Sequence, residues 1–352
     1  MKFSLAGGGL LMFAAGQAAA AEANPVRTLS LENPVLTLEV TPDIGGRVLS
    51  VARRGQDNIL KLGKAAQHQA TPAANSDFIP WFGHEMWVGP QSQWWIHQTV
   101  NPQRAAAKAV WPPDPWLVQG AHKVLQHSAQ LIELESPASP VSGVQMRKRW
   151  QLMPDQPDSV FLEVEAVNIR SEAVAWDLWF NTRLHPQTRV YAPVADPDQA
   201  RIQQITDEQH AELDYQWHEN FFTLNLAPVD APAKGRRGKV FIQPDAGWMA
   251  GFYGNQVLII HFPLQPAEAI HPEQGQIELY LEYYPQDETA GLLEMEVHAP
   301  YRQLAPGETM VASEVWTLLD YPGAANPDAE LAFLQEHIPL LNARLKLATY
   351  AP

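Results

Sequence analysis

Residues 291–316, GLLEMEVHAPYRQLAPGETMVASEVW, decide the fold. The first part of this stretch alternates apolar with ionisable side chains, with Leu293, Met295 and Val297 set against Glu294, Glu296 and His298. A period of two predicts a half-buried strand, because successive side chains on a strand point to opposite faces. Same-face neighbours then lie roughly 6–7 Å apart, so two carboxylates and an imidazole share one face. Such a face either carries acid–base chemistry or is an ordinary solvated surface.

Short runs of strand character recur on both sides of this stretch, separated by turn residues such as Pro154-Asp155 and Pro306-Gly307. The predicted strands are Val35–Val40, Val48–Ala52, Leu131–Glu135, Val160–Asn168, Val174–Thr182, Lys239–Gln243, Met249–Tyr253, Val257–Phe262, Gln276–Tyr284, Leu292–His298 and Met310–Leu318. No Gly-rich loop opens a helix and no repeat of fixed period is present, which excludes a nucleotide-binding α/β fold and a propeller. The pattern predicts an all-β protein, a large antiparallel sandwich.

One helix is predicted, near the C-terminus. Asn326 suits the N-cap and Pro327 the first helical position. Apolar side chains follow at helical spacing: Leu331, Phe333, Leu334 and Ile338. Pro339 is expected to kink or split this helix. We expect the helix to pack on the sandwich.

The N-terminus has the pattern of a cleaved secretory signal peptide. Lys2 precedes an apolar run, Leu5–Phe13, that is too short to span a bilayer, and small residues follow up to Ala21. The expected organisation is a signal peptide at 1–21, a β-supersandwich domain at 22–322 and a C-terminal helical tail at 323–352. The expected location is the periplasm or the outside of the cell, with no membrane association after cleavage.

The composition excludes several kinds of catalytic site and binding partner. The chain has no cysteine, which excludes thiol catalysis and Cys-type zinc sites. Its net charge of −15 makes nucleic acid and anionic lipid poor partners. No His-Glu-x-x-His motif or similar metal signature is present, so no metal and no cofactor is expected, although a hard cation held by carboxylates stays open.

A region of irregular pattern at 64–116 holds half of the 12 tryptophans, namely Trp81, Trp87, Trp94, Trp95, Trp111 and Trp116. A second irregular region covers 193–239. Flat aromatic faces bind the apolar faces of sugar rings, so an exported protein with clustered tryptophans favours a carbohydrate partner. The alternative is that these rings plug the end of the sandwich. His84 lies beside Glu85 in this region and suits a general acid, or else an ordinary structural hydrogen bond. His185 follows a predicted strand and would rim a cleft, whereas His261 is expected to be a core histidine.

Four segments in order resemble the galactose-mutarotase-like supersandwich superfamily, and within it a bacterial family of unknown function. The segments are Thr41–Val48 with its Gly-Gly-Arg, Gly83–Pro90 with Gly-His and Trp, Asn168–Arg183, and the closing hairpin from Glu294 to Trp316. The resemblance implies one antiparallel supersandwich whose concave sheet face binds sugars.

The resemblance also implies an activity, in which a Glu base takes the proton of the anomeric hydroxyl and a His acid protonates the ring oxygen. By position, Glu296 matches the base, with Glu294 second, and His84 is the expected acid. Arg47, Arg183 and Trp87 would orient the ring, and Trp81 and His185 complete the expected binding residues. The chain departs from the pattern at Glu85, where related sequences usually have Arg, and a second catalytic His is not recognisable.

Three functions follow from these observations. The first is an exported enzyme acting on a carbohydrate, most simply an aldose 1-epimerase-like isomerase. The second is a non-catalytic periplasmic carbohydrate-binding protein. The third is a cell-envelope protein that keeps only the fold, with a cleft filled by side chains such as Trp94 and Trp95.

Overall fold

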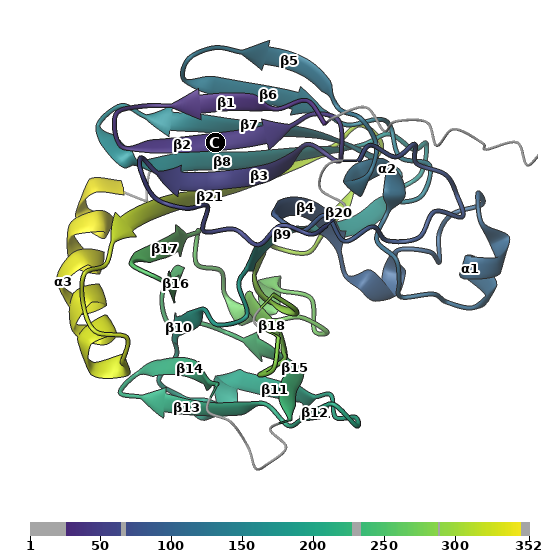
Figure 1. The fold of residues 1–352 in the computed structure, drawn as a ribbon. Coiled ribbons are helices and arrows are strands. Elements are labelled where there is room, and N and C mark those ends of the chain that lie inside the picture. Colours follow the sequence, from purple (N-terminus) through teal and green to yellow (C-terminus); the bar gives the residue numbers. More distant parts are fainter. Residues whose placement is uncertain (1–25, 65–67, 227–233, 288, 346–352) are drawn as a thin grey trace, which may run out of the picture.

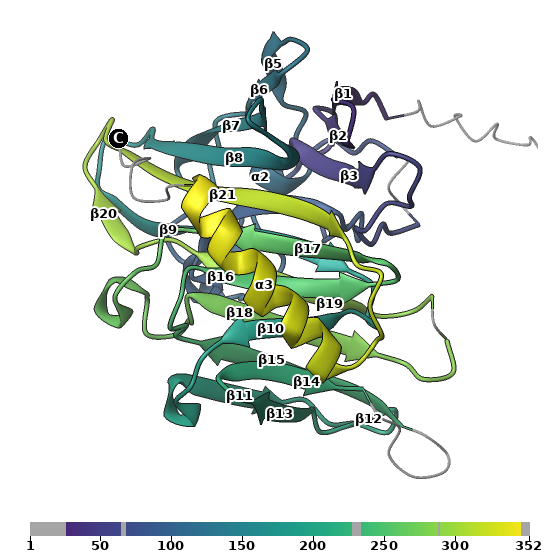
Figure 2. The same ribbon diagram turned by 90° about the vertical axis from the view of Figure 1, so that its left-hand side faces the viewer.

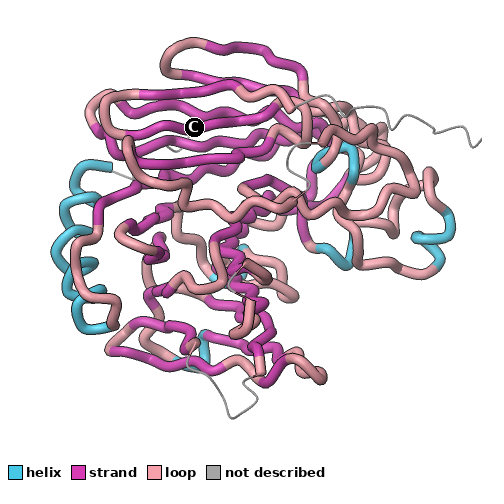
Figure 3. The backbone as a smooth tube through the Cα atoms, in the orientation of Figure 1, coloured by secondary structure: helices cyan, strands magenta, loops and turns pink. Residues whose placement is uncertain are grey.

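Alternating apolar and polar residues form two stacked, mainly antiparallel sheets, as the sequence predicted (Figure 1). The computed structural model describes residues 26–64, 68–226, 234–287 and 289–345. The expected signal peptide, residues 1–21, lies outside these ranges. The tube in Figure 3 shows a described chain built mainly of strands and loops, with few helices.

Within the described ranges, the first sheet has eleven strands. Their spatial order is β1 (Leu29–Glu32), β2 (Leu36–Thr41), β3 (Arg47–Arg53), β4 (His84–Gly89), β9 (Val174–Leu184), β19 (Leu292–His298), β18 (Ile277–Tyr283), β15 (Gly235–Ile242) and β11 (Ala200–Gln204). Two short strands lie off this path, β12 (His210–Ala211), parallel to β15, and β20 (Arg302–Leu304), antiparallel to β9.

The second sheet has ten strands in the same part of the chain. Their order is β13 (Asp214–His218), β14 (Phe221–Asn225), β10 (Arg189–Pro193), β16 (Trp248–Tyr253), β17 (Gln256–His261), β21 (Thr309–Asp320), β8 (Gln156–Asn168), β7 (Val144–Met153), β6 (Leu131–Glu135) and β5 (Lys123–His127). All its pairs are antiparallel.

The core lies between the sheets. A side chain built at Gly251 of β16 would meet the Met295 sulfur of β19 at 2.9 Å, so the apolar face of β19 points toward the second sheet. Leu293 and Val297 share this buried face. The predicted alternation of β19 therefore holds, and its ionisable side chains lie on the outer face of the first sheet. The strand is not half-buried as predicted, because Glu296 and His298 are buried as well and only Glu294 among the three is partly exposed.

The closing segment differs from the expected hairpin. Its turn forms, because the Glu308 amide donates to the Ala305 carbonyl at 2.9 Å. However, β19 belongs to the first sheet and β21 to the second, so residues 291–316 cross from one sheet to the other. The stretch thus joins the two layers of the sandwich.

The predicted C-terminal helix is α3 (Pro327–Leu345), which lies across the outer face of the ten-stranded sheet (Figure 2). Asn326 caps it by accepting a hydrogen bond from the Ala329 amide at 3.0 Å. Pro339 does not split it, since one continuous helix runs through this position, and Ile338 and Leu341 on either side pack in the same apolar cluster. Among the described residues, no helix combines the length and apolar character needed to cross a membrane.

The tryptophan-rich region is only partly irregular. It contains β4, whose residues are all buried, together with the short helices α1 (Pro102–Ala106) and α2 (Pro115–Val118). Three 3₁₀ turns also occur in the described chain, at Gln91–Gln93, Pro197–Gln199 and Ala267–Ala269. The second irregular region holds β11 to β14.

Candidate functional site

Strand register gathers ionisable side chains on the outer face of the first sheet. Glu296 lies opposite Asn181 of β9 and Glu278 of β18. Two residues earlier, Glu294 lies opposite Arg183 and Tyr280 on the same strands. Because directly opposed residues on antiparallel strands project to the same face, two polar rows cross the middle of this sheet.

A lysine from the next strand lies between two of the carboxylates. Lys239 of β15 places its Nζ 2.6 Å from a Glu278 oxygen and 2.9 Å from a Glu296 oxygen. The same ammonium lies 4.8 Å from the centre of the Trp179 ring. We call Glu278, Glu294, Glu296 and Lys239 the floor of the site.

The floor holds its carboxyl groups in two protonation states. Burial would raise the pKa of Glu278, but Lys239 and His298 outweigh it and lower this pKa to about 2. Burial raises the pKa of Glu296 well above its ordinary value, against the opposing charge of Lys239, and the neighbouring Glu294 and Glu278 raise it further. A pair of carboxyls with diverging pKa values is the arrangement that supplies one proton acceptor and one proton donor.

His298 lies next to the floor, between the carboxylates of Glu278 and Asp177. Its ring nitrogens are 3.4 Å from Glu278 and 3.5 Å from Asp177, and its ring centre is 4.7 Å from that of Trp179. Burial alone would lower the pKa of His298, but Glu278 and Asp177 raise it to about 9. The imidazolium therefore adds a second positive charge next to Glu278.

The donor atoms of Glu278, Glu296 and His298 lie within 4.8 Å of one another, a spacing that would suit a metal ion. Lys239 already supplies a positive charge between the two carboxylates at 2.6 and 2.9 Å. Two of the three residues that would hold a cation, Glu278 and Glu296, are thus the ones that pair with the lysine.

An arginine links the floor to a buried ion-pair network. The Nε of Arg183 lies 2.7 Å from Glu294, and its NH1 nitrogen pairs with Glu85 of β4. Glu85 also pairs with Arg47 at 2.5 Å. Burial would raise the pKa of Glu85, but Arg47 and Arg183 lower it, which keeps this buried carboxylate ionised.

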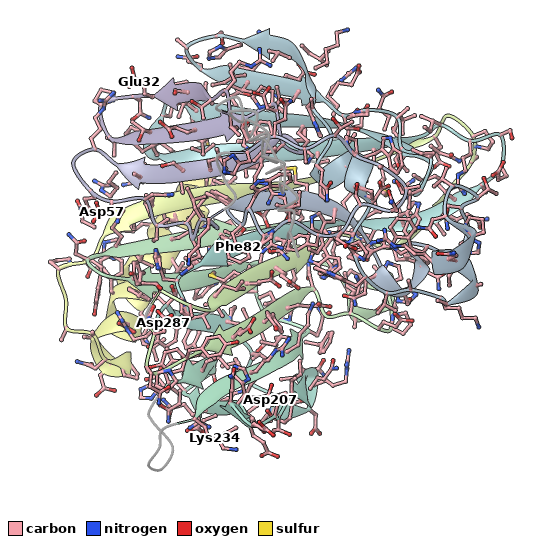
Figure 4. The ribbon with its side chains drawn as sticks, turned by 45° about the vertical axis from the view of Figure 1, so that its right-hand side comes forward. Glu32, Asp57, Phe82, Asp207, Lys234 and Asp287 are labelled. Carbon is pink, nitrogen blue, oxygen red and sulfur yellow. The ribbon has the colours of Figure 1, made fainter. Side chains whose placement is uncertain are left out.

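The floor forms one side of a cavity of about 850 Å³. Aromatic side chains line much of the rest of the cavity, and we call them the aromatic wall: Phe78, Phe82, Trp87, Trp111 and Trp179. Charged residues of β11 and β15, Arg201 and Arg237, line its far edge. Figure 4 labels Phe82, which lines the cavity, and Asp207, whose carboxylate lies 3.9 Å from the cavity residue Arg237. Polar groups facing aromatic rings in a concave site suit a sugar.

Four of the residues expected from the sequence meet in this cavity, namely Glu294, Glu296, Arg183 and Trp87. The guanidinium carbon of Arg183 lies 5.2 Å from the centre of the Trp87 ring. The strands that carry them are β4, β9 and β19, which are neighbours in the sheet.

The expected pairing of His84 with Glu296 is corrected by the structure. His84 projects to the opposite face of the sheet, where its ring centre lies 4.7 Å from that of Trp316 in the second sheet. Its Nδ1 is 3.0 Å from the Thr182 hydroxyl. Burial, with nearby cations, lowers its pKa well below the ordinary value, so this histidine is neutral. Its neighbour Glu85 occupies the cavity side of β4 instead.

Three further expected binding residues do not line the cavity. Trp81 is buried in a small cluster with Ile44 and Leu49. Arg47 is fully buried, and it reaches the site only through Glu85. His185 stacks on Tyr253, with ring centres 4.3 Å apart.

The sequence analysis missed Lys239, Glu278 and Trp179. Each lies in a segment that it predicted as a strand. In the predicted strand Gln276–Tyr284, the side chain of Glu278 must point to the face opposite that of the apolar Ile277 and Leu279. This alternation is the signal from which Glu278 could have been predicted as a site residue. Nothing in the sequence alone fixed the register that brings the three strands together.

The two-layer architecture and the site on its outer face define a protein with the galactose-mutarotase-like fold. The profile of the family described as "Domain of unknown function (DUF4380)" matches residues 26–319, and the chain belongs to this family. No functionally curated protein matches the sequence.

Solved structures resemble this chain in fold at low sequence identity. A galactose mutarotase related enzyme from Lactobacillus acidophilus has a TM-score of 0.50 at 10% identity, over 84% of this chain and 98% of that one. The Slr1438 protein from Synechocystis sp. PCC 6803 has a TM-score of 0.51 at 15% identity, over 84% and 98%. A candidate aldose 1-epimerase from Klebsiella pneumoniae has a TM-score of 0.50 at 13% identity, over 87% and 81%.

Proposed function

We propose that this protein binds a carbohydrate in the cavity and interconverts its anomers, the reaction of an aldose 1-epimerase. The observation that carries the proposal is the floor, where Glu296, whose pKa is raised, lies two residues from the Arg183-paired carboxylate of Glu294, beside an aromatic wall in one cavity. The fold that this chain shares with a galactose mutarotase related enzyme supports it.

The proposed acid–base pair is Glu294 and Glu296. Glu294 is paired with Arg183, and its side chain is 15% exposed, so its carboxylate is presented to the ligand. It takes the proton of the anomeric hydroxyl. Glu296, whose pKa is raised by burial, gives its proton to the ring oxygen. The bond between the anomeric carbon and the ring oxygen breaks, and an aldehyde forms.

Rotation about the bond next to the aldehyde then turns its carbonyl, and ring closure gives the other anomer. During closure Glu296 takes back the proton of the former ring oxygen, and Glu294 returns its proton to the carbonyl oxygen. The chain ends in its starting state, so no co-reactant is needed. In this assignment Glu294 is the base, the role that the sequence predicted for Glu296. Glu296 is the acid, the role predicted for His84.

Two-dimensional exchange NMR on a panel of free aldoses tests this proposal. Glu294→Gln and Glu296→Gln should each lower the catalysed exchange rate by about 10²-fold or more, the usual contribution of a general acid or base. Glu135→Gln on β6, outside the cavity, is the matched control and should leave the rate unchanged. Equal exchange with and without protein for every sugar would remove the enzymatic proposal.

A second candidate is binding without turnover. The side chains of Glu278 and Glu296 are 2% and 0% exposed, and both already pair with Lys239. A floor so enclosed would serve as a fixed hydrogen-bonding surface for hydroxyl groups. Calorimetric affinity for a sugar whose anomer exchange is not accelerated would favour this candidate.

We also propose that the protein works in the periplasm or outside the cell. The support is the apolar and small-residue pattern of residues 1–21. Intact-mass measurement on protein from an exporting cell should show a chain that begins near residue 22. A full-length chain retained in the cytoplasm would contradict this.

A further inference from the structure

We propose that the ligand is an oligosaccharide, with its reducing-end unit on the floor and the next unit against Trp111. The proposal rests on the function proposed above and names the substrate class of the same cavity. We call Phe78, Val110 and Trp111 the lip, because they line the mouth of the cavity on the side away from β15.

The lip exposes unusually large apolar side chains. Val110 is 48% exposed and Trp111 is 47% exposed, and both line the cavity. Single exposed apolar residues are common on protein surfaces, but adjacent ones that continue into a cavity mark a binding surface. A half-exposed indole presents a flat apolar face of the kind that sugar rings stack on.

The Trp111 ring is held in place from below. Its centre lies 4.8 Å from the ring of Phe78, in an edge-to-face contact, and 6.2 Å from that of Trp94. The following residue, Pro112, accepts a hydrogen bond from the Trp95 indole at 2.7 Å. A ring ordered before binding loses little conformational entropy when a ligand stacks on it.

The cavity has room for more than one sugar unit, and a row of aromatic rings joins the lip to the floor. The Trp111 ring centre is 6.2 Å from that of Trp87, which is 5.0 Å from that of Trp179. Trp179 in turn lies 4.8 Å from the Lys239 ammonium on the floor. A hexose, with about a dozen non-hydrogen atoms, would leave much of the cavity empty, because its 850 Å³ lies high in the range of about 300–1,000 Å³ typical of larger ligands.

The chemistry fixes the direction of the chain. Anomer exchange requires a free anomeric carbon, so only the reducing-end unit can lie on the floor. The unit linked to it then extends toward the mouth, where the lip provides its apolar contact. A single free hexose would use the floor and leave Trp111 exposed.

The test is calorimetric titration with free sugars that form matched series, from glucose, galactose, mannose and xylose to the corresponding di- and trisaccharides. Wild type should bind the disaccharide of at least one series roughly tenfold more tightly than its monosaccharide. Trp111→Ala should remove this advantage, so that the disaccharide binds about as tightly as the monosaccharide, whereas Trp111→Tyr should keep most of it. Leu340→Ala, which removes a similarly exposed apolar side chain on α3, is the control.

The outcomes separate the two proposals. Equal affinity for monosaccharide and oligosaccharide, or a Trp111→Ala variant that binds both as wild type does, would overturn the lip while leaving the proposed function intact. Failure of wild type to bind any sugar of the series would overturn both. Thermal unfolding of each variant shows whether it is folded. If Trp111→Ala does not fold, Trp111→Tyr keeps the test decisive.

Discussion

At the scale of single residues, Lys239 controls the site. Its ammonium compensates the buried Glu278 carboxylate, contacts the carboxyl group of Glu296 and lies over the Trp179 ring. Burying a charge costs several kcal/mol unless it is paired, so Glu278 depends on this cation and on His298. The same charge opposes the burial that raises the pKa of Glu296, the proton donor of the proposed reaction.

Replacing Lys239 with Met should lower the free energy of unfolding by about 3–5 kcal/mol at neutral pH, because the Glu278 carboxylate loses a buried counterion. The loss should shrink as the pH falls, since protonation removes the uncompensated charge. Chemical denaturation at several pH values measures this. Lys123→Met, at an exposed position on β5, is the matched control and should change little. An equal effect of the two substitutions would contradict the role given to Lys239.

His298 should make stability depend on pH in a defined direction. Its pKa is raised to about 9 in the folded chain, against about 6.5 when unfolded. A raised pKa means that this stabilisation is complete below pH 6.5 and is lost as the pH rises through 9. The stability difference between wild type and His298→Gln should therefore fall by roughly 3 kcal/mol over that range. A difference that stays constant from pH 6.5 to 9 would argue against a charged His298.

Residue identity alone could not select the acid. His84 and Glu85 are adjacent on β4, so they point to opposite faces of the sheet. The sequence analysis treated this segment as a loop, in which the direction of a side chain cannot be deduced. By contrast, Glu294 and Glu296 were assigned from a clear alternation, and both line the cavity.

At the scale of elements, alternation predicted the strands that have one apolar face. The predictions for Leu131–Glu135 and Leu292–His298 match β6 and β19 residue for residue. β4 was missed because all six of its residues are buried, which leaves no alternation to detect. The turn after β19 was also predicted, but no local pattern could show that the chain changes sheet there.

Helix α3 should contribute to stability through the apolar face that it covers. Leu334 is buried against the sheet, whereas Leu340 on the same helix is 53% exposed. Leu334→Ala should cost about 2–5 kcal/mol of unfolding free energy, and Leu340→Ala less than about 0.5 kcal/mol. Denaturant titration measures both. Equal costs would show that α3 does not pack as described.

At the scale of the molecule, the outer faces of the two sheets have different roles. The faces between them form the core, and α3 covers the outer face of the ten-stranded sheet. The outer face of the eleven-stranded sheet is left for the cavity, whose residues come from β4, β9, β11, β15, β18 and β19. The resemblance predicted this architecture from four short segments, whereas the pairing of floor and aromatic wall emerges only when the strands are in register.

The central claim is that a sugar binds between the floor and the aromatic wall. The 12 tryptophans allow a direct measurement, because each indole N–H gives its own signal in a ¹H–¹⁵N spectrum, assigned by single Trp→Phe substitutions. On titration with a sugar, the signals of Trp87 and Trp179 should shift, and an oligosaccharide should shift that of Trp111 as well, while those of Trp150 and Trp316, buried in the core, should not move. A sugar that binds without moving the Trp87 and Trp179 signals would contradict the account.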